Sequence, residues 1–115
     1  AALGCAQLEN LDRYIASKRE IAAAYAEFFK NVDGLDFFTE PENCFSNYWL
    51  NVVILKDKDA QLEFLQQTND NKVMTRPIWE LMNRLPMFEM CENDGLESTI
   101  WFADRVVNIP SSVKL

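Results

Sequence analysis

The hydrophobic residues of the first thirty positions recur at steps of three and four, which is the spacing of one face of an α-helix. Charged and polar residues fill the other side, and Lys18 interrupts the apolar stripe. The segment has no proline and, after Gly4, no glycine, so the pattern predicts one amphipathic helix over 1–30. The stripe consists of Leu8, Leu11, Ile15, Ala22, Tyr25 and Phe29.

Such a helix would be longer than the domain to which it belongs. At 1.5 Å per residue it runs about 45 Å, whereas a compact chain of this length has a diameter of about 35 Å. Its first six residues are small or apolar, carry no charge and follow no Ser, Thr, Asp or Asn cap. We expect a neighbour to cover this tip, either another part of a larger protein or the same tip of a second copy.

The strongest strand pattern lies at 48–55, where β-branched and aromatic residues occupy both alternating faces except at Asn51. It predicts a central strand in which the Asn51 side chain bonds backbone groups. Gly34 suits the left-handed turn that ends the first helix. Further strands are predicted at 35–38, at 72–76 with Pro77 closing it, and at 106–109.

Two further helices are predicted. The first follows Asp57 or Asp59, either of which can cap it, and ends within 68–71. The second begins at 93 or 94 and reaches 105, whereas 78–88 has no clear period and is predicted as a loop with one helical turn. The order of elements predicts an α+β fold in which the long helix and further helices pack on one face of a small, mainly antiparallel sheet.

Length and composition fit a single globular domain, and they limit its partners. The 115 residues include 18 acidic and 11 basic side chains, and a net charge of -7 argues against nucleic acid as a partner. No apolar run approaches the roughly 20 residues that cross a bilayer, and no signal-peptide pattern opens the chain. These features predict a cytoplasmic protein with no membrane partner.

Histidine is absent and no CxxC spacing occurs, which argues against a metal site and against His-activated nucleophiles. The three cysteines, Cys5, Cys44 and Cys91, are widely spaced and are predicted to be buried or half-buried side chains.

Arg76 is the leading candidate for ligand binding. It lies at the predicted end of a strand and is followed by the rigid Pro77, so its guanidinium can bind a phosphate or carboxylate bidentately. A surface arginine paired with an acidic side chain is an equally good interpretation. Asn47 at a strand end is a further candidate. Trp79 is more typical of core or loop packing than of a ligand platform.

Five stretches together resemble the carboxyl-terminal domain of DegT-type nucleotide-sugar aminotransferases, which are pyridoxal-phosphate (PLP) enzymes of the aspartate-aminotransferase fold. The shared helix motif contains Gln7, Leu8, Leu11, Asp12, Arg19 and Tyr25. The TRP segment and the NIPSS ending are similar to members that act on nucleotide-linked 4-keto-6-deoxy sugars. The stretches are AALGCAQLENLD, KREIAAAY, CFSNYWLNVVIL, TRPIWELMNRLPMF and RVVNIPSS.

This resemblance implies that 1–115 is the small domain of a larger enzyme whose large domain, absent here, holds PLP and the Schiff-base lysine. The parent would be a cytoplasmic homodimer that transfers an amino group from glutamate or a similar donor to the sugar, typically for surface polysaccharide biosynthesis. The isolated domain would not be catalytic, and no catalytic residue is expected within it. The large domain would cover the apolar tip of the first helix.

The family's cleft segment matches Thr75, Arg76 and Pro77, and Arg76 is expected to bind nucleotide phosphate or donor carboxylate. Many members have Pro-Leu-His where this chain has Leu-Met-Asn ending at Asn83, which can bond a hydroxyl or phosphate but cannot shuttle a proton near neutral pH. Weaker candidates for the same cleft are Ser46, Asn47 and Trp49. The competing hypothesis is a non-enzymatic α+β module that binds a metabolite or mediates dimerisation, because fold alone does not fix function.

Overall fold

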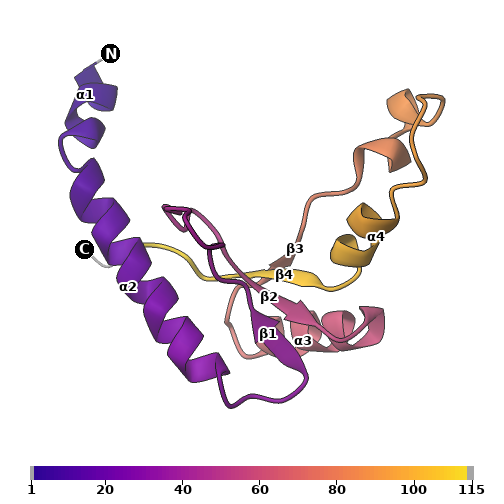
Figure 1. Ribbon diagram of the computed structural model, residues 1–115, viewed down its shortest axis with the longest axis horizontal. Helices are drawn as coiled ribbons and strands as arrows, with labels where there is room; N and C mark the ends of the chain where they lie inside the picture. The colour runs from indigo at the N-terminus through magenta and orange to yellow at the C-terminus, as the bar shows by residue number, and fades with distance from the viewer. Residues whose placement is uncertain (1, 114–115) are drawn as a thin grey trace.

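The computed structural model describes residues 2–113. Four strands form one sheet in the order β1-β2-β4-β3, and each neighbouring pair is antiparallel. The predicted α+β class and the small antiparallel sheet are therefore confirmed. The elements are α1 (Ala2–Leu8), α2 (Leu11–Phe29), β1 (Leu35–Phe37), β2 (Asn51–Leu55), α3 (Lys58–Asp70), β3 (Arg76–Pro77), the 3₁₀ turns η1 (Met82–Arg84) and η2 (Pro86–Phe88), α4 (Glu97–Ala103) and β4 (Val106–Ile109) (Figure 1).

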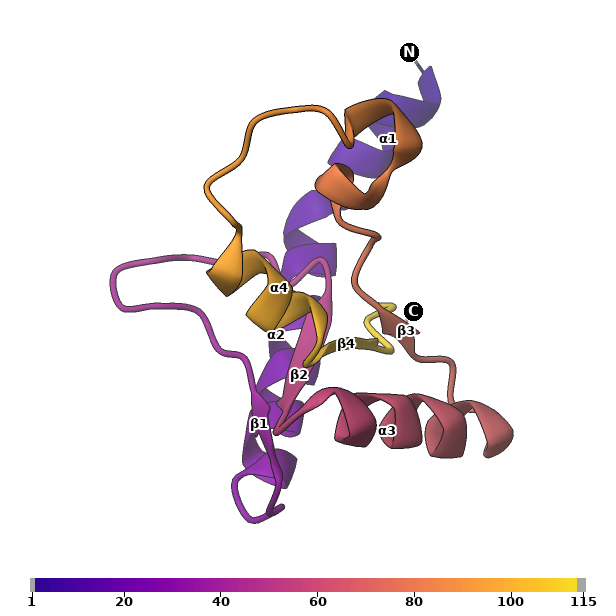
Figure 2. The ribbon, with the colours of Figure 1, turned by 90° about the vertical axis from the view of Figure 1, so that its right-hand side faces the viewer.

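The hydrophobic core lies on one face of this sheet. Alternate residues of a strand point to the same face, and Val53 and Val107 stand opposite each other in the β2–β4 register. Together with Leu55 and Ile109 they form the buried cluster. Two helices pack against it, as predicted: α2 contributes Tyr25 and Phe29, and α3 contributes Ala60, Phe64 and Leu65. In Figure 2, α3 lies below the strands.

The predicted single helix over 1–30 is wrong in one respect, because a break separates α1 from α2 at Glu9 and Asn10. Asn10 has φ -105° and ψ 3°, and its Nδ2 donates to the carbonyl oxygen of Ala6 at 3.0 Å. A side chain that bonds the carbonyl four residues back competes with the helical ladder, which accounts for the break. Ala1 lies outside the described residues.

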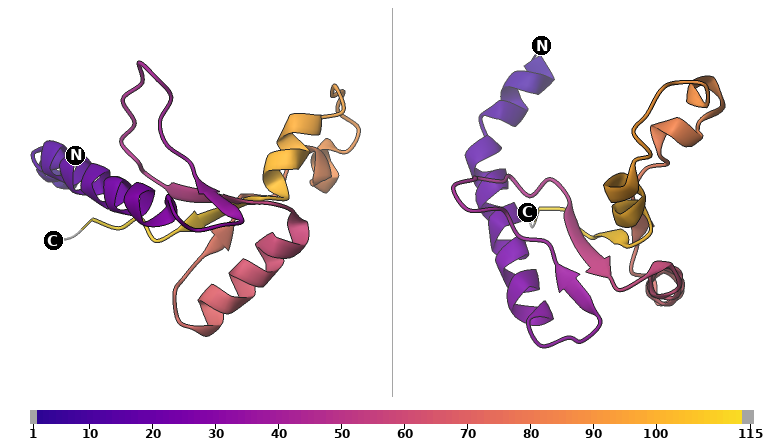
Figure 3. Two further views of the ribbon diagram at one scale, coloured as in Figure 1. Left: turned by 60° about the horizontal axis from the view of Figure 1, so that its bottom comes forward. Right: turned by 45° about the vertical axis from the view of Figure 1, so that its right-hand side comes forward.

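The predicted overhang of the first helix is confirmed. Every residue of α1 is exposed, and Leu3 and Leu8 keep 77% and 67% of their surface. Both α1 and the segment carrying η1 and η2 project away from the sheet to the same side (Figure 1, Figure 2, and the right view of Figure 3). The radius of gyration is accordingly 16.8 Å, above the roughly 13 Å of a compact chain of this length.

Left-handed backbone at non-glycine residues shortens two predicted elements. β2 begins at Asn51 rather than at Tyr48, because Tyr48 has φ 44°. α4 begins at Glu97 rather than at 93 or 94, because Leu96 has φ 54°, and it ends at Ala103 rather than 105. Such φ values cannot continue a strand or a helix.

The remaining bounds differ less. β1 stops at Phe37, one residue early, and 78–88 forms two 3₁₀ turns instead of one helical turn. The strand predicted at 72–76 is reduced to Arg76–Pro77, since Lys72 has φ 64°. Pro77 therefore lies inside an edge strand, where no donor is missed. Other details are confirmed: Gly34 has φ 86°, α4 and β4 follow in order, and Asp57 caps α3 by accepting from the Ala60 amide at 2.9 Å.

Two predictions about buried side chains are wrong. Asn51 is 1% exposed, yet neither its Oδ1 nor its Nδ2 has a hydrogen-bond partner among residues 2–113. The local backbone is already engaged, because β2 pairs with β4 and the Asn51 amide donates to Ser111 Oγ at 2.8 Å. Cys5, Cys44 and Cys91 are free and exposed, because they lie on α1, in the β1–β2 loop and after η2, all outside the core.

Candidate functional site

A cavity of about 390 Å³ lies where β4 ends, between α2 and β3. Its wall brings together segments that are far apart in the sequence: the middle of α2, the residues just before β2, the start of β3, and the chain that leaves β4. The residues that line it are Lys18, Trp49, Leu50, Met74, Arg76, Asn108, Ile109, Pro110, Ser111 and Ser112.

Arg76 is the exposed cation of this cavity. The strand β3 holds its backbone, because Arg76 pairs with Asn108 in the ladder and Asn108 Nδ2 donates to the carbonyl oxygen of Pro77 at 3.1 Å. Its guanidinium contacts the sulfur of Met74, with Nη2 at 3.3 Å, and forms no ion pair with the described residues. The donor fork is therefore available to a ligand.

Lys18 is the second cation of the cavity. Its ammonium donates to the carbonyl oxygens of Trp49 at 3.2 Å and Ser111 at 2.6 Å. These two contacts fix the ammonium at the end of β4. Within 2–113 no carboxylate forms an ion pair with it.

The charge of the cavity is opposite to that of the chain. The whole chain has a net charge of -7, yet no Asp or Glu lines this cavity in the described part of the chain, whereas Lys18 and Arg76 both do. A concave surface with charges of one sign attracts ligands of the opposite sign. The cavity can therefore bind an anion. A larger cavity of about 650 Å³ beside β1 contains Lys30, Lys56, Asp33 and Asp36 in its wall, so it has no such selectivity.

Two tryptophans contact each other, and one of them lines the cavity. Trp49 lines the cavity, and its ring lies 6.2 Å from the ring of Trp79, centroid to centroid, with 31° between the planes. Both side chains are largely exposed, at 64% and 72%. Trp79 therefore packs against another loop residue, as the sequence favours, while leaving apolar surface open to a ligand.

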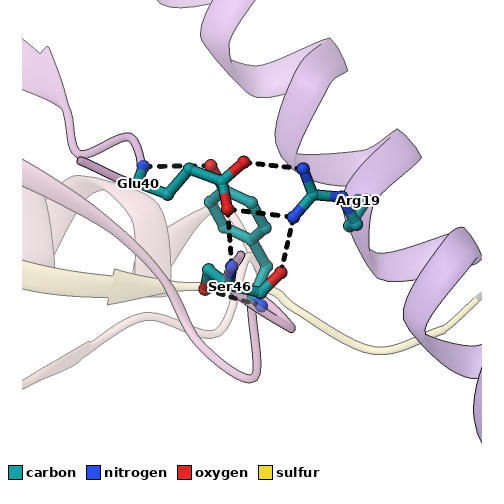
Figure 4. Close-up of polar contacts among 4 residues, drawn as sticks. Arg19, Glu40 and Ser46 are labelled. Carbon is teal, nitrogen blue, oxygen red and sulfur yellow. Dashed lines mark hydrogen bonds and ion pairs between the residues drawn. The ribbon is translucent and has the colours of Figure 1, made fainter. Parts of the chain in front are cut away.

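The loop that carries Trp49 is held on α2 by a group of polar contacts. This loop, 38–50, stands away from the sheet in the left view of Figure 3. Arg19 binds Glu40 with two hydrogen bonds, Nη1 to Oε2 at 2.9 Å and Nη2 to Oε1 at 2.6 Å, and also donates to the Ser46 carbonyl at 2.7 Å. The Ser46 amide donates to Glu40 Oε2 at 2.5 Å, and the Tyr48 hydroxyl accepts from the Glu40 amide at 3.1 Å (Figure 4).

These contacts shift the ionisation of both partners. The hydrogen bond from Arg19, followed by that from the Ser46 amide, lowers the pKa of Glu40 from its ordinary 4.5 to about 2. The hydrogen bond to Glu40 raises the pKa of Arg19 in turn. The guanidinium also lies 4.1 Å from the centroid of the Phe45 ring. The pair is fully ionised at neutral pH and fixes the loop to the helix.

Only some of the predicted site residues line the cavity. Arg76 and Trp49 line the cavity. Ser46 and Asn47 lie close in sequence but shape the loop: Ser46 Oγ accepts from the Tyr48 amide at 3.0 Å, and Asn47 Oδ1 accepts from the Trp49 amide at 3.0 Å. Both residues therefore set the position of Trp49.

Thr75 and Asn83 lie outside the cavity wall. Thr75 is 5% exposed, and its hydroxyl bonds Thr68 Oγ1 at 2.6 Å and accepts from Asn69 Nδ2 at 3.0 Å. These contacts anchor the residue before Arg76 to the end of α3. Asn83 sits in η1, and its buried Oδ1 has no hydrogen-bond partner in the described range.

Sequence reasoning missed Lys18 and the role of Arg19. The available signal was the interruption of the apolar stripe of α2 by Lys18. Burying a charged residue at such a position costs free energy unless the charge has a polar partner elsewhere in the chain. Its partner Ser111 is 93 positions away, so no local pattern could identify it.

Solved structures with this fold include an aminotransferase and a dehydratase that contains PLP. The aminotransferase TlmJ of Streptoalloteichus hindustanus superposes with a TM-score of 0.85 at 22% identity, over 95% of this chain and 29% of its own. The GDP-4-keto-6-deoxy-D-mannose-3-dehydratase of E. coli, solved with bound hydrated PLP, gives a TM-score of 0.69 at 19% identity, over 96% of this chain and 30% of its own. The chain therefore has the fold of one part of the larger PLP-dependent aminotransferase fold.

The chain belongs to the DegT/DnrJ/EryC1/StrS aminotransferase family, whose model matches residues 1–115. The GDP-perosamine synthase of Vibrio cholerae is 31% identical over 117 residues, which cover 96% of this chain and 31% of the relative. The chain therefore spans about a third of the length of this relative. The resemblance noted in the sequence is confirmed. None of the helices described in 2–113 is long and apolar enough to cross a membrane.

Proposed function

We propose that this chain is the small domain of a PLP-dependent aminotransferase that transfers an amino group from glutamate or a similar donor to a nucleotide-linked 4-keto-6-deoxy sugar. Family membership over the whole chain and the likeness to a GDP-perosamine synthase support this proposal. The observation that supports a binding role for this domain is the cavity that Arg76, Lys18 and Trp49 line, with no acidic residue in its wall among residues 2–113. Nucleotide sugars and amino-acid donors are both anionic.

The large domain of the same polypeptide would hold the cofactor and the Schiff-base lysine. Among residues 2–113, Lys18 donates to two carbonyl oxygens, and carboxylates pair with Lys30, Lys56 and Lys58. Lys72 is exposed in the turn after α3 and lines neither of the two cavities described above. The described residues therefore do not fit a PLP site on their own. When bound in the parent, PLP supplies the electron sink for amino transfer. The small domain would orient the substrate.

The parent is further proposed to act as a cytoplasmic homodimer in the synthesis of a surface polysaccharide sugar. The exposed apolar residues of α1 and of the start of α2 support a covering neighbour. Leu3 and Leu8 on α1 and Leu11 on α2 are its clearest candidates for contact. In this arrangement the large domain packs on α1.

The first experiment is an absorbance titration of the full-length protein with PLP, followed by glutamate. We expect an absorbance band of protein-bound PLP. Glutamate should convert it to the band of the pyridoxamine form of the cofactor. A full-length protein that takes up no cofactor and does not respond to glutamate would contradict the proposal. A regulatory or dimerisation module with this fold would then be the better assignment.

The role of Arg76 is tested in the same protein. Because one charge-assisted hydrogen bond is worth about 1.5–3 kcal/mol, Arg76→Ala should raise the apparent KM for one anionic substrate by about tenfold or more. The fold should remain intact, since the side chain is exposed. Unchanged kinetics for both substrates would remove Arg76 from the site.

A further inference from the structure

The proposed function leaves two anions open for the cavity, a donor carboxylate and a phosphate. Lys18 distinguishes them. It lines the same cavity as Arg76 but lies on α2, whereas Arg76 lies on β3. Two cations from separate elements therefore face one space of about 390 Å³.

The ammonium of Lys18 is positioned but not saturated. An ammonium has three N–H donors, and the carbonyl oxygens of Trp49 and Ser111 accept from two of them. Neutral carbonyls orient the group without neutralising its charge. One donor and the full positive charge remain for a ligand.

The charge balance favours a ligand with more than one negative charge. Glutamate carries two carboxylates but also an ammonium group, which the two cations would repel, and no acidic residue in the described wall compensates either cation. A diphosphate carries at least two charges on oxygens of neighbouring phosphorus atoms, so it can contact both cations at once. Arginine binds such oxygens as a fork and lysine binds them as a point charge.

We propose that Lys18 and Arg76 together bind the diphosphate of the nucleotide sugar, with Lys18 as the second cation. This inference rests on the proposed function. Trp49 lines the same cavity, is largely exposed and packs against Trp79, so it offers a surface on which the group attached to the diphosphate can stack.

The test measures the binding of inorganic pyrophosphate to the full-length, PLP-loaded protein by calorimetry. Lys18→Gln and Arg76→Gln should each weaken pyrophosphate binding by about tenfold or more. Lys18→Arg keeps the charge and should stay within about threefold. Lys56→Gln is the matched control, because it also removes one positive charge but from a side chain that is 70% exposed and outside this cavity. It should change the affinity by less than about twofold.

Competition identifies the anion that occupies the cavity. A nucleoside diphosphate should displace pyrophosphate, and glutamate should not. Displacement by glutamate would assign the cavity to the donor carboxylate, and displacement by excess PLP would assign it to the cofactor phosphate. Either result overturns the proposal, as does an unchanged affinity in folded Lys18→Gln.

Thermal unfolding shows whether Lys18→Gln is folded, and Arg76→Gln serves in its place if it is not. An unchanged pyrophosphate affinity in Arg76→Gln then overturns the proposal. The proposed function is judged separately, by the cofactor band and its conversion with glutamate. A protein that passes that assay but binds pyrophosphate independently of Lys18 retains the aminotransferase assignment and loses only the diphosphate site.

Discussion

Gln61 holds three elements together, and its replacement by alanine should be among the most damaging changes in this chain. Its side chain is 0% exposed. Nε2 donates to the carbonyl oxygens of Ala103, at the end of α4, and of Val106, at the start of β4, at 2.9 and 2.8 Å. The side-chain amide of Gln61 in α3 therefore fixes the connection between α4 and the central strand β4.

The expected cost follows from these contacts. Two hydrogen bonds contribute about 1 kcal/mol each, and truncating a buried side chain of this length to alanine costs a further ~2 kcal/mol or more. The buried Oε1 of Gln61 has no partner in the described range, so its removal returns about 1 kcal/mol. Gln61→Ala should thus lower the free energy of unfolding by about 3 kcal/mol. With a urea m-value of about 2 kcal/mol/M the midpoint falls by about 1.5 M. Gln61→Leu retains the volume and should lose about half as much.

Urea unfolding of the 115-residue chain, followed by circular dichroism, measures this difference. Gln66→Ala is the matched control on the same helix, because Gln66 is exposed and bonds only Asp70 in the described structure. It should change the free energy by no more than about 0.5 kcal/mol. Equal midpoints for Gln61→Ala and Gln66→Ala would refute the reasoning.

Three further changes test other features. Asn51→Val should raise the free energy of unfolding by about 1–3 kcal/mol, because the buried amide has no partner in the described range; a lower urea midpoint would contradict this. The depressed pKa of Glu40, about 2, makes its ionised form stabilising above about pH 4.5, a contribution lost as the pH falls toward 2. Glu40→Gln should therefore flatten the fall in Tm over that window, while Glu42→Gln, an exposed neighbour, should not. The exposed leucines of α1 should bind a hydrophobic dye, and Leu3→Ser with Leu8→Ser should abolish most of that fluorescence.

Local patterns predicted the fold well wherever a regular face is buried. The alternation in β2 places Val53 and Leu55 in the core, and Asp57 caps α3 as its position before the helix indicates. Two of the wrongly predicted bounds share a cause. Tyr48 and Leu96 adopt positive φ, a conformation for which these residue types have no preference, and so the ends of β2 and α4 could not be predicted from propensity.

The candidate site was predictable only in part, because its geometry depends on long-range contacts. Arg76 could be found from its place before Pro77, and Trp49 from the family resemblance. The contact between Lys18 and Ser111 joins residues that are 93 positions apart. The periodicity of the sequence gives no information on such a contact. Thr75 matched the family's segment, yet its hydroxyl is used to anchor the chain at α3.

The same helix that covers the core also builds the wall of the site. Successive residues of an α-helix point about 100° apart, so Lys18 and Arg19 face different directions from one turn of α2. Lys18 reaches the carbonyls at the end of β4 and before β2, while Arg19 holds Glu40 and Ser46 in the loop that carries Trp49. A rotation of α2 about its axis would displace both at once, and Tyr25 and Phe29 in the core prevent that rotation. The stability of the core and the geometry of the anion cavity are therefore coupled through α2.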